Sequence, residues 1–142
     1  MRFALSTTLR IVDVLDRGIP HHERVVIAVD RPCNLGKYVL MRGLRSPDGT
    51  NVVAIGPVTS FWFPDQQAKR HSVVFVYTDP GRFIETVVSN TSVPTLAALQ
   101  IPALVYHWGS AETLFNHPDW VPLVLRANRI ALPPGVRPTA EP

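Results

Sequence analysis

Residues 61–65 read FWFPD, and residues 73–77 read VVFVY. The first run is aromatic and ends in a Pro-Asp pair, which is typical of a tight corner, and the second is β-branched and aromatic throughout. Together they predict a strand, a turn and a second strand, as in an antiparallel β-sheet. No nucleophile, metal or phosphate motif lies beside them. This stretch therefore decides the architecture and leaves the activity open.

The rest of the chain follows the same pattern of short apolar runs between turns. Its 14 prolines and eight glycines are spread over the whole length and oppose any long helix. Residues 25–29 and 73–77 lack polar alternation, so we expect their strands to be covered on both faces or to lie at the centre of the domain. An all-β sandwich or barrel of about eight strands is predicted. The predicted strands cover residues 3–15, 24–30, 37–42, 58–63, 72–78, 83–88, 103–108 and 122–126.

The size and composition of the chain indicate a single domain. It has 142 residues, of which 46% are hydrophobic and 18% are charged, so a core can form without disulfides or metals. We expect one β-sandwich domain over residues 1–132 and a disordered, Pro-rich tail over residues 133–142. Residues 89–102 are the least regular, and we expect a loop there with a short helical turn over residues 92–99.

The composition also indicates the cellular location and the kinds of partner to expect. Ser and Thr interrupt the first ten residues, so they do not form a signal peptide, and no apolar run approaches the roughly 20 residues of a membrane helix. We therefore expect a soluble, cytoplasmic protein with no membrane partner. The single cysteine, Cys33, has no intramolecular disulfide partner and is expected to be passive. A net charge of +3 permits an anionic partner without requiring one.

Few residues are candidates for chemistry, and we expect no cofactor. His107, His117 and Asp119 are weak candidates for a metal or acid-base site, because a strand end and the following loop can converge. His21 and Glu23 fall on one face of a strand and could share a site, although a polar turn is the simpler interpretation. Gly-x-Ser-x-Gly and complete Walker motifs are both absent, so serine hydrolysis and nucleotide hydrolysis are unsupported.

A second group of residues is a candidate for binding. Lys69 and Arg70 form a short basic run, and Trp62 or Tyr77 can offer an aromatic face for stacking a nucleic-acid base. An outward-facing Trp62 can also anchor a protein partner. A solvated turn remains the simpler interpretation of the basic run.

Read in order, several short motifs resemble the lamin tail domain family, over roughly residues 20–126. In that family, a strand carrying Glu leads into Asn-Leu and a Gly-aromatic strand, and a Phe-Pro corner precedes the next strand. The resemblance implies an immunoglobulin-like antiparallel β-sandwich, and a binding or scaffolding role, which such domains mostly serve. The matching motifs are residues 23–25 (ERV), 34–38 (NLGKY), 61–65 (FWFPD), 74–78 (VFVYT), 106–109 (YHWG) and 114–116 (LFN).

These observations favour a non-enzymatic module that acts through protein-protein contacts. A nucleic-acid-binding module using Lys69 and Arg70 is the first alternative, and a metal-dependent hydrolase using His107, His117 and Asp119 is the second. Edge strands of an open sandwich can also pair with a second copy of the chain, but the sequence does not identify those edges.

Overall fold

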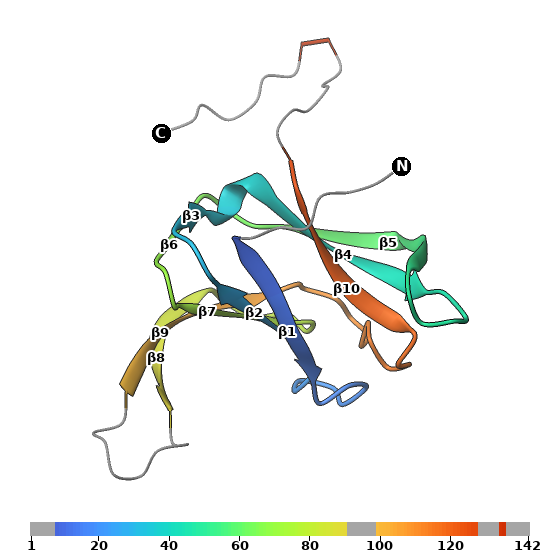
Figure 1. The fold of residues 1–142 in the computed structure, drawn as a ribbon, viewed down its shortest axis with the longest axis horizontal. Coiled ribbons are helices and arrows are strands. Elements are labelled where there is room, and N and C mark those ends of the chain that lie inside the picture. Colours follow the sequence, from blue (N-terminus) through green and yellow to red (C-terminus); the bar gives the residue numbers. More distant parts are fainter. Residues whose placement is uncertain (1–7, 91–98, 128–133, 136–142) are drawn as a thin grey trace.

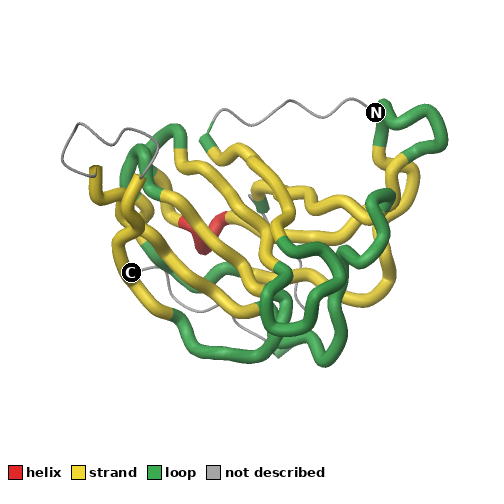
Figure 2. Tube along the Cα trace, turned by 90° about the horizontal axis from the view of Figure 1, so that it is seen from below, coloured by secondary structure: helices red, strands yellow, loops and turns green. Residues whose placement is uncertain are grey.

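The computed structural model describes residues 8–90, 99–127 and 134–135, and within these residues the fold is all-β. The only helical turn of this part of the chain is the 3-10 turn η1, Leu35–Lys37, drawn red in Figure 2. The strands are β1 (Leu9–Leu15), β2 (Arg24–Val29), β3 (Cys33–Asn34), β4 (Tyr38–Arg45), β5 (Val52–Trp62), β6 (Gln67–Ala68), β7 (Val73–Tyr77), β8 (Ile84–Asn90), β9 (Leu99–His107) and β10 (Trp120–Arg126).

The strands form two main sheets and one small ladder. The larger sheet has the order β1-β2-β7-β9-β8, the second has the order β10-β4-β5, and β3 pairs with β6 (Figure 1). All pairings are antiparallel except β7 with β9. That exception arises because the chain passes from β7 to the outermost position, runs back along β8, and returns as β9 between them. The sandwich-like all-β fold predicted from the sequence is confirmed.

The core lies between the two main sheets. Val74 and Val76 of β7 are fully buried, whereas their neighbours along the strand are only partly covered, as expected when one face of a strand packs inward. Ile27 from β2 and Leu40 from β4 meet them from the same sheet and the opposite sheet. Phe115, from the loop before β10, is the largest side chain with no exposed surface. The apolar runs of β2 and β7 thus occupy the interior of the larger sheet, as predicted.

The prediction of a loop over residues 89–102 is wrong at both ends of that segment. Residues 89–102 were expected to form a loop, but Ser89 and Asn90 continue β8, and Leu99–Pro102 begin β9. Cross-strand pairing overrides the poor strand propensity of this segment, because Val87 lies opposite Pro102 and Val88 opposite Ile101. The predicted helical turn and the disordered tail fall largely on residues outside the described ranges.

The β8-β9 pair extends beyond the rest of its sheet. The pairing of β7 with β9 starts at Val73 and Ala103, so Leu99–Pro102 have β8 as their only strand partner. In Figure 1 this two-stranded ribbon projects from the body at the lower left. The described part of the chain holds no helix long and apolar enough to cross a membrane.

Candidate functional site

A buried carboxylate organises the loops at one end of the sandwich. Glu23, just before β2, is 1% exposed, and its two oxygens accept four hydrogen bonds. The backbone N–H of Gly18 donates to Oε2 at 2.7 Å. The N–H groups of Leu114 and Phe115 donate to Oε1 at 2.6 and 3.1 Å, and the Thr78 hydroxyl donates to it at 3.1 Å. Such a set of donors replaces the water that a buried carboxylate loses.

The same loops are held a second time by Arg17. Its guanidinium donates to the backbone oxygens of Phe115, His117 and Trp120, at 3.3, 3.4 and 2.8 Å. Glu23 therefore accepts hydrogen bonds from backbone N–H groups of the segment before β10, while Arg17 donates hydrogen bonds to backbone oxygens of the same segment and of Trp120. Because both residues come from the connection between β1 and β2, this connection fixes the position of the segment.

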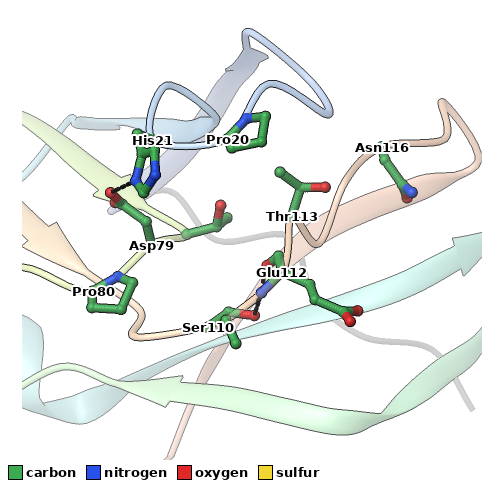
Figure 3. Close-up of a pocket in the computed structure, with 10 residues that line it drawn as sticks. Pro20, His21, Asp79, Pro80, Ser110, Glu112, Thr113 and Asn116 are labelled. Carbon is green, nitrogen blue, oxygen red and sulfur yellow. Dashed lines mark hydrogen bonds and ion pairs between the residues drawn. The ribbon is translucent and has the colours of Figure 1, made fainter.

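The loops held by Glu23 and Arg17 surround an open cleft of about 450 Å³. Its walls come from Pro20 and His21, from residues 78–80 after β7, and from residues 110–113 and Asn116 after β9 (Figure 3). This volume lies within the range of small-ligand sites and can also admit one or two side chains of a partner protein. The cleft is therefore a preformed concavity on a firmly held frame.

Asp79 joins two histidines at the side of this cleft. Its Oδ2 lies 3.1 Å from Nδ1 of His21, and its Oδ1 lies 3.0 Å from Nδ1 of His107. Burial opposes ionisation of Asp79, but the hydrogen bonds from His21 and His107 outweigh it and hold the pKa of this carboxyl below its ordinary value. His21 has a φ of 66°, a left-handed conformation uncommon outside glycine. Asp79 thus connects the β1-β2 loop to the end of β9.

His107 is fixed on its other sides as well. Its ring stacks on Tyr77 with ring centroids 5.3 Å apart, and the Arg24 guanidinium lies 5.6 Å from the Tyr77 ring centroid. The Gly81 backbone lies so close to the ring that a Cβ there would come within 2.5 Å of three of its atoms. A side chain at position 81 would displace the ring, so glycine is required there for packing.

Two of the three hydroxyl groups that line the cleft, those of Ser110 and Thr78, form hydrogen bonds; the third belongs to Thr113. Ser110 Oγ donates to the backbone oxygen of Glu112 at 2.7 Å, and the Thr78 hydroxyl donates to Glu23. Both hydroxyls are thus bonded to other groups, and neither forms a hydrogen bond to His21 or His107.

A second candidate surface is the outer edge of β8. Every residue from 82 to 87 is exposed, and three large apolar side chains lie there: Phe83 at 44%, Ile84 at 53% and Val87 at 52% exposure. β9 is the only described strand that pairs with β8, so its outer N–H and C=O groups face no other described strand. An edge of this kind is a template for another strand.

The other three sheet edges carry features that oppose strand addition. In β1, the register shifts between Ile11 and Asp13, which is a bulge beside a charged side chain. β10 has Pro122 within the strand, and β5 has an irregular segment, residues 56–59, that contains Pro57. Between Ile84 and Asn90, β8 has no proline, no lysine and no register shift. Of the four edges of the two main sheets, β8 alone is free of both prolines and register shifts.

The structure separates the predicted nucleic-acid-binding residues. Lys69 and Arg70 are exposed in the turn before β7, whereas Tyr77 ends that strand, about 13 Å further along by the strand rise. Trp62, 53% exposed, belongs to the other sheet. Lys69 and Arg70 form no ion pair with any described residue. The basic run is thus available to an anion, but Tyr77 lies at the other end of its strand.

The predicted metal-site residues engage different partners. His107 faces Asp79, whereas His117 accepts a hydrogen bond from the Asp119 backbone at 3.1 Å and lies 3.6 Å from its carboxylate. Among residues 8–90, 99–127 and 134–135, no three His, Cys, Asp or Glu side chains are grouped as a metal site requires. The suggestion that His21 and Glu23 share a site is wrong, because Glu23 is buried and bonded to backbone groups while His21 is exposed.

Cys33, in β3, is partly buried. Burial raises the pKa of its thiol, and the nearby charge of Arg126 only partly offsets this effect. A raised thiol pKa lowers the fraction of reactive thiolate at neutral pH, which agrees with the passive role expected from the sequence.

Sequence reasoning missed Asp79 and the exposure of β8. Asp79 stands in an Asp-Pro-Gly sequence that signals only a turn, and its two histidine partners are 58 and 28 residues away along the chain. No family model, curated protein or solved structure matches this chain.

Replacing Glu23 by Gln tests its role in holding the loops. The amide NH2 would face one of the backbone N–H groups and leave buried donors unpaired, so we expect a loss of about 2–3 kcal/mol in the free energy of unfolding. Urea denaturation measures this loss. Glu85→Gln, at an exposed position in β8, is the control and should change stability by less than about 0.5 kcal/mol. Equal effects of the two substitutions would contradict the role of Glu23.

The pKa of Asp79 predicts a pH dependence. Because its pKa in the folded state lies below the ordinary value of 3.8, its ionised form contributes stability above that pH and loses it as the pH falls through the folded-state pKa. Asp79→Asn should therefore be less stable than the wild type from neutral pH down to about pH 4. The difference should shrink in more acidic solution.

Urea denaturation over a pH series measures this difference. Asp119→Asn, whose carboxylate is 55% exposed, is the matched control and should follow the wild type throughout. A difference between wild type and Asp79→Asn that persists unchanged in strong acid would contradict the ionisation argument.

Proposed function

We propose that this protein is a non-enzymatic module that binds protein partners by accepting a strand at the edge of β8. The observation that carries the proposal is the contrast between this regular, apolar, exposed strand and the three irregular edges. In strand addition, backbone hydrogen bonds supply affinity and alternate side chains supply specificity. Ile84 and Val87, which point to opposite faces of the ribbon, offer an apolar contact on each face.

The likeness to lamin tail domains supports the same role. Those immunoglobulin-like sandwiches mostly serve as binding or scaffolding modules, and the motif in which a Glu opens a strand corresponds here to Glu23 and β2. Fold analogy alone does not give function, so the proposal depends on β8.

Nucleic-acid binding is a second candidate, favoured by the free cations near the β3-β6 ladder. Arg31, Lys69 and Arg70 are exposed, form no ion pair with described residues, and flank the paired residues Cys33 and Ala68. Binding through them would weaken steeply with salt.

A capture experiment with matched variants tests the proposal. The wild type, Val87→Lys and Val12→Lys serve as baits in a lysate of the source organism, with and without nuclease, followed by quantitative mass spectrometry. Val12 and Val87 are both valines on edge strands, exposed by 53% and 52%. Lysine on an edge strand opposes strand addition.

We expect the wild type and Val12→Lys to capture at least fivefold more of the same protein partners than Val87→Lys does. The reason is that, of the edges compared, only β8 is regular enough to accept a strand. Equal capture by all three baits would overturn the role of β8. If nuclease treatment abolishes the capture of proteins by every bait, the result would instead favour nucleic-acid binding.

A further inference from the structure

We propose that β8 also pairs with β8 of a second copy of this chain. The two strands would run antiparallel and be related by a two-fold axis at Val87. This inference rests on the proposed function, since it uses the same edge and names one partner for it. The pairing would join the two larger sheets into one continuous sheet of ten strands, five from each copy.

The sequence of β8 is suited to this symmetry. The described part of the strand runs from Ile84 to Asn90, and Val87 lies at the centre of these seven residues. An antiparallel pair centred there places Val87 opposite itself and Thr86 opposite Val88 of the second copy. Apolar and β-branched residues in such directly opposed positions stabilise a sheet. The middle of the strand is thus complementary to itself.

The charges of β8 permit the same register. Glu85 is its only charged residue, and the axis at Val87 places it opposite Ser89 of the second copy. The two Glu85 side chains would lie four positions apart along the strands, about 14 Å by the strand rise. This distance exceeds the screening length at physiological salt, so repulsion between them is weak. The register that opposes apolar residues therefore also separates like charges.

Exposed apolar side chains are concentrated at the start and middle of β8. Seven large hydrophobic side chains are exposed by more than 40%, and Phe83, Ile84 and Val87 are three of them within five residues. The part of the ribbon formed by Val87–Asn90 and Leu99–Pro102 projects from the body, so a second copy can approach this half of β8 from the side (Figure 1). The interface is accordingly small, in the class of weak complexes that bury less than about 1,200 Å².

The geometry also favours a closed pair over a fibre. A two-fold contact uses the same edge on both copies and leaves no free β8 behind. Growth beyond the dimer would need another regular edge, and β1, at the far side of the same sheet, has a bulge at Ile11 and Asp13. The expected assembly is a dimer that does not extend.

Sedimentation velocity of the purified chain, from about 10 µM to 1 mM, tests the assembly. We expect the wild type and Val12→Lys to shift from monomer to dimer with concentration. Val87→Lys would place two lysines face to face on the axis and should raise the dissociation constant at least tenfold. Monomers throughout for the wild type would overturn the inference, as would equal association of all three proteins.

Cysteine cross-linking tests the register in a Cys33→Ser background. Under mild oxidation, Val87→Cys should form disulfide-linked dimers, because the axis brings its Cβ atoms within about 5 Å. Glu85→Cys and Ser89→Cys should cross-link poorly alone and efficiently when mixed, since they face each other. Val12→Cys gives the rate from random collision. Cross-linking of Glu85→Cys alone as fast as Val87→Cys would overturn the register.

The two proposals can fail separately. If the chain stays monomeric while Val87→Lys still loses captured proteins, then β8 binds other partners and the self-pairing is wrong. If the chain dimerises through β8 but Val87→Lys and the wild type capture the same proteins, then the edge serves assembly and the proposed function is wrong.

Discussion

The buried carboxylate of Glu23 is the interaction on which one end of this sandwich depends. A carboxyl group placed at 1% exposure without a cation would be very unfavourable if it were not fully hydrogen-bonded. Here its four donors come from three separate parts of the chain: Gly18, Thr78, and the pair Leu114 and Phe115. Gly18, Leu114 and Phe115 lie in loops, and their N–H groups donate to this carboxylate, whereas Thr78 donates its hydroxyl. Glu23 therefore supplies acceptors for backbone donors that lie beyond the ends of the strands.

This clamp makes the two ends of the larger sheet physically different. At the Glu23 end, loops are tied by Arg17, Glu23 and Asp79, so the cleft between them has fixed walls. At the other end, Leu99–Pro102 of β9 pair with no described strand except β8. Local stability follows the density of such contacts, so the ribbon is the part most able to adapt to a partner.

The parts of the fold that follow local rules were predictable from the sequence. Eight apolar runs bounded by turn residues correspond to the eight longer strands, because a run of β-branched and aromatic residues has few alternatives between closely spaced prolines and glycines. The two-residue ladder of β3 and β6 and the start of β9 at Leu99 were missed. These elements exist only through pairing with distant residues, such as Cys33 with Ala68, and leave no local pattern.

The candidate site was less predictable for the same reason. Asp79, His21 and His107 are brought together by the arrangement of β2, β7 and β9, and nothing in their own neighbourhoods marks them as partners. The sequence of β8 likewise reads as an ordinary strand, since an edge strand and an interior strand of this length can share a composition. Only the sheet order shows that it is outermost and that its apolar residues stay uncovered.

The exposure of Val87 in β8 is informative because each of the other three edges of the main sheets contains a proline or a bulge. A chain under pressure only to stay monomeric would be expected to break every edge, and prolines or bulges already do so in β1, β5 and β10. In β8 the one charged residue, Glu85, lies off centre, which leaves Val87 and its neighbours free to meet an identical strand. A single Lys at position 87 would close this edge at almost no cost to the fold, because that side chain is half exposed already. The edge is therefore better explained as a contact surface than as a tolerated defect.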